Sequence, residues 1–372
     1  MIRQLIHWGY RTVIKPLLFR KSPDKVHKDL VKLAGLVQKI PPVRSMPRIW
    51  AEPRGEVLAQ TIAGIEFSSP IGLSAGFDKE ISMARLMQAV DFGWMTGGSV
   101  TWGQYAGNEG NWFYRLPKTK SLVVNAGLPS SGTESVLRRL ETQDPAIFKD
   151  FPLNVSVAKT NTKQTVDEKD AVEDYCKSLA AFDTQHAVKM LEINISCPNT
   201  FGGEPFTTPE RLQNLLESVD ALQLTKPVFI KMPINLDISA YDALLDVIIR
   251  HNVQGIAVGN LQKDRAKVSL KENLPSGVKG NLSGAPTREI STDLIRHTYQ
   301  KYGTQLAIIG IGGVMSATDA YEKICAGASL VGLITGLIFE GPTLPAQINH
   351  DLKHLLEADG YTSIQQAIGS KA

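Results

Sequence analysis

Residues 306–313, with the sequence LAIIGIGG, and residues 330–336, with the sequence LVGLITG, decide the fold class of this chain. Each is a short apolar run that ends in glycine, and the first leads into a helical pattern that begins near Ser316. Continuous apolar runs of this length are typical of parallel strands that are buried on both faces. Strands of this kind separated by helices predict βα units, so we expect an α/β protein with a parallel sheet.

The same alternation of buried strand and helix extends back to residue 70. Six further strand candidates precede the two above: residues 70–76, 94–100, 152–158, 189–196, 227–233 and 255–260. Eight βα units predict a (β/α)8 TIM barrel, and a short hairpin around Gly64 is expected to close its bottom. A doubly wound open sheet is the alternative, although it usually has fewer strands and the GxGxxG fingerprint is missing after the first strand.

The composition excludes several classes of protein. With 43% hydrophobic residues among 372, the chain can bury a large core, and a barrel can use this length as one domain. Forty basic against 37 acidic residues give a net charge of +3, too balanced for a general nucleic-acid binder. The three cysteines are too scattered for a disulfide framework or a CxxC zinc site, so we expect a reducing compartment and no metal centre. No apolar run reaches the roughly 18 residues of a membrane span.

Basic charge is concentrated at the N-terminus, where residues 1–44 carry ten Lys/Arg and two acids, a net of +8. Apolar residues recur there at helical spacing, which predicts a first helix. Ser22 and Pro23 are suited to start a second helix, which we expect to end near Gly35. The segment therefore predicts a helical hairpin.

The predicted organisation is a helical hairpin at residues 1–40, a proline-rich linker at 41–60 and the barrel at 61–372. The hairpin does not look like a signal peptide, because Arg11 and Lys15 interrupt any apolar core. Two interpretations remain open. The hairpin either packs on the barrel and does nothing more, or it lies on an anionic membrane surface, as basic amphipathic helices do.

In a (β/α)8 barrel the chemistry lies at the C-terminal ends of the strands. Strand seven ends in Gly312 and Gly313, and strand eight ends in Thr335 and Gly336, each before a helix. Glycine lets a backbone approach a ligand closely, and helix N-termini attract anions. Barrels commonly hold a phosphate in these two loops. The pair predicts a phosphate-bearing cofactor or substrate, although glycines also serve tight packing.

Strand four ends in Asn194 and leads to Cys197, in a loop stiffened by Pro198. A cysteine there could be a nucleophile, a metal ligand or a general base, and the alternative is a buried structural thiol. Strand five carries Lys231, a charge that must be paired if it is buried. The lysine, the asparagines and the phosphate loops indicate a flat, polar heterocycle beside a phosphate-bearing cofactor. We interpret residues 261–284, a long loop after strand six, as a lid.

At these residues the sequence resembles the dihydroorotate dehydrogenase family over nearly the whole chain. The segments that carry the resemblance are SAGFDK (74–79), NISCPNT (194–200), NLSG (281–284), IIGIGG (308–313) and AGASLVGLITGLIF (326–339). The resemblance implies a (β/α)8 barrel that binds FMN and oxidises dihydroorotate to orotate in pyrimidine synthesis. The hairpin is similar to that of the membrane-associated class 2 enzymes, where it forms an apolar entrance for a quinone. This implies a peripheral protein on the cytoplasmic face of the inner membrane.

The resemblance also implies roles for single residues. The expected FMN-binding residues are Ala75, Gly76, Ser99, Ser156, Asn194, Lys231, Gly259, Gly284, Gly312, Gly313, Thr335 and Gly336. The expected substrate-binding residues are Lys79, Asn125, Gly127, Leu128, Asn194, Asn199 and Asn260. Cys197 is the expected base, which takes a proton from C5 of the substrate while a hydride passes from C6 to flavin N5. Class 2 enzymes have serine here, so the chain combines a class 2 hairpin with a class 1 base.

Several positions depart from the family pattern and leave other activities open. An ungapped match places Val124 at a substrate asparagine, whereas a one-residue deletion restores Asn125. Leu261 replaces a polar residue, and on the quinone side Gly103 replaces an arginine and Ile334 a tyrosine. The alternatives are a related FMN oxidoreductase acting on another dihydropyrimidine or small enone, a non-redox sugar-phosphate barrel, and a silent flavin-binding module.

Overall fold

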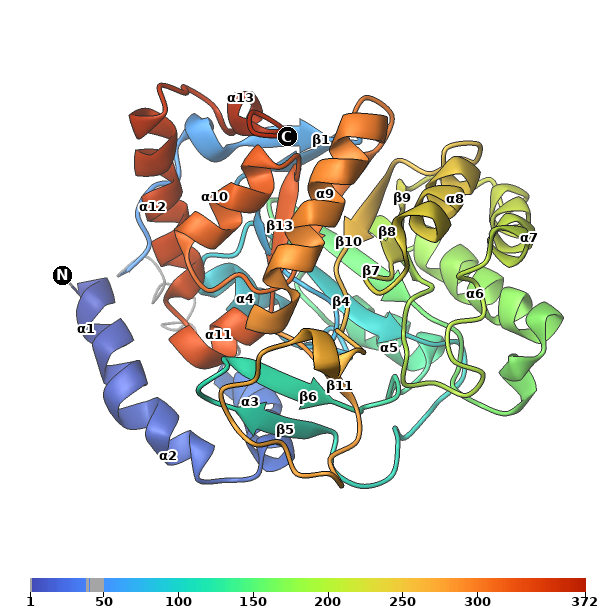
Figure 1. Cartoon of the computed structure of the whole chain (residues 1–372), viewed down its shortest axis with the longest axis horizontal. Helices are drawn as coiled ribbons and strands as arrows, with labels where there is room; N and C mark the ends of the chain where they lie inside the picture. The colour runs from blue at the N-terminus through green and yellow to red at the C-terminus, as the bar shows by residue number, and fades with distance from the viewer. Residues whose placement is uncertain (1, 38–39, 41–49) are drawn as a thin grey trace.

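The structure, a computed structural model, describes residues 2–37, 40 and 50–372 and is built around a closed barrel of eight parallel strands (Figure 1). The strands are β3 (Ile71–Leu73), β4 (Trp94–Val100), β7 (Leu153–Val157), β8 (Val188–Asn194), β9 (Val228–Met232), β10 (Gly255–Val258), β12 (Ala307–Ile311) and β13 (Leu330–Leu333). They follow one another in chain order, and β13 pairs with β3 to close the barrel. All eight predicted strands and the (β/α)8 fold class are confirmed. Residues 41–49 of the predicted linker lie outside the described residues.

Helices surround the barrel, because the segments between the strands have one apolar face each. They are α4 (Ala84–Ala89), α5 (Thr133–Glu141), α6 (Glu168–Asp183), α7 (Pro209–Asp220), α8 (Ile238–Ile248), α9 (Arg288–Tyr302), α10 (Ala317–Cys325), α11 (Thr335–Glu340), α12 (Leu344–Ala358) and α13 (Ile364–Ala367). The prediction of a helix start near Ser316 is confirmed. The side chain of Ser316 caps α10 by accepting a hydrogen bond from the backbone N–H of Asp319.

The bottom of the barrel is sealed by a layer of large apolar side chains. Its members are Phe67, Trp94, Met190, Phe229, Ala257, Ile309 and Leu330, each at most 2% exposed. Phe67 comes from the predicted hairpin, in which β1 (Gln60–Ile62) and β2 (Ile65–Phe67) pair antiparallel. Its ring meets that of Trp94 edge to face, with 6.3 Å between centroids. The hairpin therefore closes the bottom, as predicted.

A small antiparallel sheet lies over the opposite end of the barrel and was not predicted. Its strands are β5 (Phe113–Leu116), β6 (Ser121–Val124) and β11 (Asn281–Leu282). β11 belongs to residues 261–284, which the sequence indicated as a lid loop. Leu282 packs with Leu116 and Val123 in a separate buried cluster. Part of the predicted lid is therefore an anchored strand, whose pairing with β6 depends on residues distant in the sequence.

The N-terminal segment forms the predicted helical hairpin. The helix α1 (Ile2–Gly9), the π-helical turn η1 (Tyr10–Ile14) and α2 (Lys15–Phe19) follow one another without a break. The second helix, α3 (Pro23–Val37), begins at Pro23 as predicted, ends beyond Gly35 and contacts β5. Figure 1 shows the segment along one side of the barrel, next to α11.

The first arm of the hairpin is fixed to the end of α11. The Tyr10 hydroxyl and the Lys15 ammonium donate hydrogen bonds to the carbonyls of Ile338 and Phe339, at 2.7 and 3.0 Å. The carboxylate of Glu340 is buried between two cations, one from the arm at 3.6 Å and one from the turn between β5 and β6 at 2.7 Å. These contacts show that the hairpin packs on the barrel.

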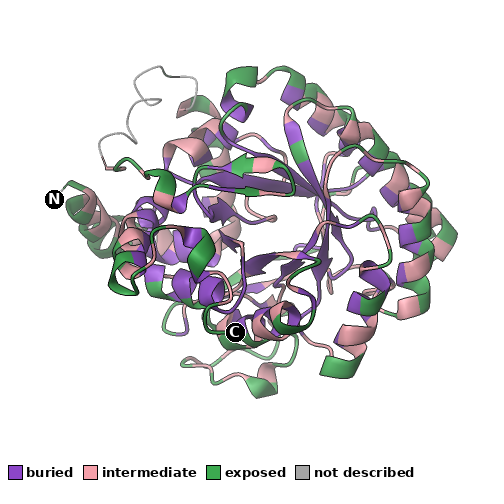
Figure 2. Cartoon of the chain, turned by 90° about the horizontal axis from the view of Figure 1, so that it is seen from above, coloured by how far each residue is buried: buried purple, intermediate pink, exposed green. Residues whose placement is uncertain are grey.

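Much of the apolar surface of the hairpin nevertheless faces outward (Figure 2). The exposed large apolar side chains of this segment are Ile2, Leu5, Trp8, Val13, Ile14, Leu17, Leu30, Leu33, Leu36 and Ile40. Among the described residues, no helix is both long and apolar enough to cross a membrane. The segment therefore packs on the barrel with part of its apolar surface and leaves the rest uncovered.

The apolar seal at the bottom of the barrel predicts a large effect of Phe67→Ala on stability. The substitution should lower the free energy of unfolding by about 3–5 kcal/mol, because it leaves a cavity beneath Trp94. Urea unfolding followed by circular dichroism measures the loss. Ile238→Ala, at the exposed start of α8, is the control and should stay within about 0.5 kcal/mol of wild type. Equal effects of the two substitutions would contradict the seal.

Candidate active site

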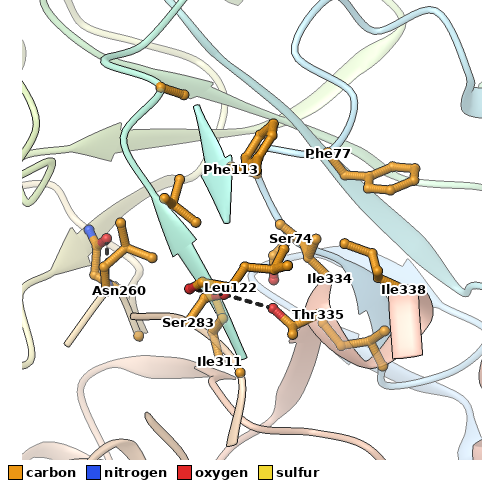
Figure 3. Close-up of a pocket in the computed structure, with 18 of the residues that line it drawn as sticks. Ser74, Phe77, Phe113, Leu122, Asn260, Ser283, Ile311, Ile334, Thr335 and Ile338 are labelled. Atoms are coloured by element: carbon orange, nitrogen blue, oxygen red, sulfur yellow. Dashed lines mark hydrogen bonds between the residues drawn. The ribbon is translucent and has the colours of Figure 1, made fainter. Parts of the chain in front are cut away.

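One large cavity opens at the carboxyl ends of the barrel strands, and Figure 3 shows part of its wall. Its volume is about 1550 Å³, the open mouth included. Strand ends form one side, residues of β5 and β6 form another, and α3 of the hairpin forms the far side. A cavity at this face of a barrel is where such folds carry their chemistry.

The structure brings most of the predicted site residues into the wall of this cavity. Those that line it are Ala75, Gly76, Lys79, Ser99, Gly127, Leu128, Asn194, Cys197, Asn199, Lys231, Gly259, Asn260, Gly284, Gly312, Gly313, Thr335 and Gly336. Ser156 and Asn125 are not among the lining residues. The side chain of Asn125 accepts a hydrogen bond from Asn108 at 3.3 Å, and Val124 lines the cavity in its place. Val124 and not Asn125 is therefore the residue of this pair that contributes to the cavity wall.

The loops after β12 and β13 form one end of the cavity. α11 begins at Thr335, whose hydroxyl lies 3.0 Å from that of Ser283 (Figure 3). Gly313 has φ +70°, and a Cβ there would lie 2.4 Å from a side-chain atom of the first residue of α9. At Gly336 a Cβ would lie 2.2 Å from the carbonyl oxygen of Val314. Only glycine fits at these two positions, so bare backbone forms this wall.

A buried polar layer crosses the barrel just below the cavity. The hydroxyl of Ser99 lies 2.8 Å from that of Ser156 and accepts a hydrogen bond from the Asn194 amide, also at 2.8 Å. Ser156 is therefore one layer behind the wall. Lys231 is buried, and the described residues offer it neither a hydrogen bond nor an ion pair. The buried hydroxyl of Ser74 likewise has no partner there. Unpaired groups in a cavity wall indicate a polar ligand.

Cys197 lies in the loop after β8 and is partly buried in the cavity wall. Burial raises the pKa of its thiol to about 11, although the backbone N–H of Asn199 and the charge of Lys231 act in the opposite direction. At neutral pH the group is therefore a thiol rather than a thiolate. Any role as a base requires that these stabilising groups, or a ligand, offset the cost of burial.

Asn199 and Asn260 reach the cavity from the loops after β8 and β10. The Asn199 amide donates to the carbonyl of Val124 at 3.1 Å and accepts from Asn281 at 3.0 Å. The Asn260 amide donates to the carbonyl of Ser196 at 2.6 Å. These bonds hold the small upper sheet and the strand ends together, so both amides have fixed orientations toward a ligand.

Lys79 is a second lysine of the cavity wall, besides Lys231. Burial lowers the pKa of its ammonium to about 8, although Asp24 and Glu80 act in the opposite direction. The ammonium lies 5.4 Å from the ring centroids of both Trp112 and Phe113, within the range of cation–π attraction. An anionic ligand beside it would favour the protonated form.

The end of the cavity that meets the hairpin is mostly apolar. The residues that line this end are Val26, His27, Leu30, Phe77, Phe113, Arg115, Leu122, Ile334 and Ile338, five of which are labelled in Figure 3. Burial first, and Lys79 second, lower the pKa of His27 to about 4, so its imidazole is neutral at pH 7. Gly103, where the resemblance led us to expect an arginine, is not part of this wall.

The resemblance implied an apolar entrance at the hairpin but did not identify the residues that line it. The spacing of Val26 and Leu30 on one face of α3 was a usable signal, because residues four apart on a helix are neighbours. It did not reveal which element that face would meet. Arg115, on β5, donates to the carbonyl of Lys21 at 2.7 Å and lies 4.5 Å from the ring centroid of Phe19. Such contacts between hairpin and barrel are long-range and carry no local pattern.

The carboxyl face of the barrel thus holds one cavity with a glycine-walled end, two lysines, a thiol and an apolar end. This combination is that of a (β/α)8-barrel enzyme. The family model described as dihydroorotate dehydrogenase matches residues 57–356. The chain belongs to the dihydroorotate dehydrogenase family and is an oxidoreductase. The family resemblance seen in its sequence motifs is confirmed.

Similar proteins cover nearly the full length of the chain. A dihydroorotate dehydrogenase (quinone) of Mycobacterium ulcerans is 32% identical over 364 residues, 97% of each chain. The protein of that name from Deinococcus deserti is 32% identical over 375 residues, which cover 98% of this chain and 100% of the relative. The crystal structure of the Eimeria tenella enzyme in complex with ferulenol has a TM-score of 0.82 at 24% identity and covers 94% of this chain and 95% of its own. That likeness supports the fold.

The buried thiol predicts an unusual pH dependence of alkylation. In the protein without ligands, the rate at which iodoacetamide modifies Cys197 should rise with pH to a midpoint near 11, because only the thiolate reacts. Mass spectrometry of the modified peptides separates this site from Cys176 and Cys325. A midpoint near about 8.5, the value of an unperturbed thiol, would show that burial does not control the group.

Proposed function

We propose that this protein oxidises dihydroorotate to orotate with bound FMN and passes the electrons to a quinone. The observation that carries the proposal is one cavity that joins the glycine-walled end, Lys231 and Cys197 to the apolar face of α3. The polar end of this cavity suits oxidation of a polar substrate, and the apolar end suits reduction of a quinone. The two half-reactions would share one cofactor. The names of the relatives, dihydroorotate dehydrogenase (quinone), support the same pair of reactants.

The residues of the polar end fit FMN. Gly312, Gly313 and the start of α11 at Thr335 would hold its phosphate, because bare backbone and a helix N-terminus favour an anion. Lys231 would face the flavin ring, and a negative charge there would supply the counter-ion that the described chain does not. Ser99 and Asn194 would contact the ring from the buried polar layer. When bound, FMN supplies a hydride acceptor, chemistry that side chains lack.

Cys197 is the group we assign as general base. Removal of a proton from C5 and of a hydride from C6 creates the double bond of orotate, so a base must lie against one face of the substrate ring. Cys197 lines the same cavity as Lys231, from the loop of a neighbouring strand. Because the pKa of the thiol is raised to about 11, the thiolate fraction, and with it the rate, should increase as pH rises above neutral.

The substrate end supports an anionic pyrimidine. Lys79 would pair with its carboxylate, and the fixed amides of Asn199 and Asn260 would meet its polar edge. Val124 and Leu261 also line the cavity and offer no hydrogen bonds from their side chains. They favour a second candidate, a related FMN oxidoreductase that acts on a less polar dihydropyrimidine or enone. Each polar group left unpaired would cost dihydroorotate about 1–3 kcal/mol.

The hairpin is proposed to be the membrane-associating part of the protein and the entrance for quinone. Residues 1–44 carry a net charge of +8, and the uncovered apolar side chains of the hairpin are suited to enter a lipid surface. The inner face of α3 contributes Val26 and Leu30 to the cavity. A quinone could pass from the lipid along this face. We place the protein at the cytoplasmic face of the inner membrane.

Anaerobic titration with dihydroorotate tests the proposed reaction. The purified protein should contain FMN, and dihydroorotate should bleach the visible absorbance of the flavin. Cys197→Ala should retain FMN and substrate affinity but slow the bleaching roughly 10²–10⁴-fold, because it removes the base. Stopped-flow absorbance measures both rates.

The outcomes of this titration separate the candidates. Bleaching by another dihydropyrimidine and not by dihydroorotate, or reoxidation of the reduced flavin by an enone, would favour the second candidate. Purification without any flavin would contradict both and favour a sugar-phosphate barrel. Bleaching of Cys197→Ala at the wild-type rate would show that Cys197 is not the base and has only a packing role.

Membrane association is tested with the double substitution Leu5→Ser, Trp8→Ser on the exposed arm. It should weaken binding to anionic liposomes at least about tenfold, because burial of each side chain in lipid is worth roughly 1.5–3 kcal/mol. Reduction of a quinone should slow, whereas flavin bleaching by dihydroorotate should not change. Trp102→Ser, also exposed but far along the chain from the hairpin, is the matched control. Unchanged sedimentation with liposomes would leave packing as the only role of the arm.

A further inference from the structure

The loop that carries Cys197 is held at Phe201 by two side chains that follow β7. The Lys159 ammonium donates to the Phe201 carbonyl at 2.9 Å. The Phe201 backbone N–H donates to the side-chain oxygen of Asn161 at 2.6 Å. Both backbone polar groups of one loop residue are thus fixed to the end of the neighbouring strand, four residues after Cys197.

Lys159 is buried, yet it forms no ion pair with any described residue. Its hydrogen-bond partner, the Phe201 carbonyl, is neutral. Asp174, on α6, attracts it from a distance, but this carboxylate is engaged by the backbone N–H and the hydroxyl of Thr160, both at 2.7 Å. The other group that favours the charged form of Lys159 is Cys197. A buried cation without a contacting anion costs free energy, so its position requires a reason.

The surroundings of Cys197 supply that reason. The titratable groups that act on it are Lys159 from the end of β7, Tyr175 from α6, Lys231 from β9 and Glu204 from its own loop. Glu204 opposes the thiolate, but it is paired with Lys263 from the loop after β10. Lys231 would be shared with the flavin ring. Of Lys159 and Lys231, only Lys159 would interact with the thiolate without also interacting with the flavin.

We propose that Lys159 is a positioning residue for Cys197, which orients the loop of residues 197–203 through Phe201 and stabilises the thiolate with its charge. The inference rests on the proposed role of Cys197 as the base. When Cys197 gives up its proton to solvent, a negative charge forms in a buried site, and a fixed ammonium lowers the cost of that charge. When the thiolate takes the proton from C5 of the substrate, the thiol is restored. Burial lowers the pKa of Lys159 below its ordinary value, although Asp174 and the thiolate of Cys197 act in the opposite direction. Its charge therefore acts on the thiolate near neutral pH and is lost in strong base.

The test compares three substitutions in the full-length, FMN-loaded protein. Lys159→Gln keeps a hydrogen-bond donor for Phe201 but removes the charge, whereas Lys159→Arg keeps both. Lys163→Met removes one charge from an exposed site in the same segment and is the matched control. For each protein, iodoacetamide gives the rate of Cys197 alkylation at pH 7 to 8 and, after a short pH jump, in strong base. Stopped-flow absorbance gives the pH profile of flavin reduction by dihydroorotate.

Lys159→Gln should slow alkylation of Cys197 at pH 7 to 8 roughly tenfold, the effect of removing one nearby opposite charge. Flavin reduction at pH 7 to 8 should slow by the same factor, because the thiolate fraction falls tenfold. Both differences should disappear in strong base, where Lys159 is itself neutral. Lys159→Arg and Lys163→Met should keep the wild-type rates at pH 7 to 8. A change in loop order alone would alter the alkylation rate by the same factor at every pH.

Alkylation of Lys159→Gln at the wild-type rate at pH 7 to 8 overturns the proposal. If Lys159→Gln does not fold, loss of the wild-type rate at pH 7 to 8 in Lys159→Arg, which keeps the charge, overturns it equally. Slower alkylation without a matching loss of flavin reduction has a different meaning. It upholds the action of Lys159 on Cys197 and shows that Cys197 is not the base, so the two failures are distinguishable.

Discussion

Closure of the barrel is the constraint on which the rest of the structure depends. β13 pairs with β3, and all eight strands run parallel around the closed ring, so their carboxyl ends meet at a single rim. The layer around Phe67 and Trp94 supplies apolar burial at the other end. The upper interior is therefore free to hold Asn194, Lys231 and hydroxyl groups that a continuous apolar core would exclude.

The helix α11 links the two ends of the proposed reaction path. Its six residues begin at Thr335, in the glycine-walled end of the cavity, and finish where Tyr10 and Lys15 bind its carbonyls. Ile334 and Ile338, one turn apart, face the cavity between these points. α11 and the residue before it thus contribute to the polar end of the cavity, to its apolar wall and to the surface on which the hairpin packs.

The barrel was predictable because each strand is a local apolar run and its rank in the chain determines its place in the ring. The location of Cys197 and Lys231 at the carboxyl face was predictable for the same reason, because both lie at or near strand ends. Long-range features were not predictable from local patterns, among them β11 and the particular residues of α3 that line the cavity. Asn125 and Val124 show a further limit: a shift of one residue turns the other side chain toward the cavity, and the motif alone allowed both alignments. Lys159 escaped notice because its partner is a backbone carbonyl.

The contacts between the first arm of the hairpin and the end of α11 have a consequence for synthesis of the chain. Tyr10 is made long before its partner Ile338, which lies 328 residues further along, and β3 likewise waits for β13. Until then the apolar arm and the open edge of β3 have no intramolecular partner, which exposes a nascent chain to aggregation. A lipid surface or a chaperone that covers the arm at this stage would protect it. The arm can therefore first meet a membrane during translation, before the barrel has folded.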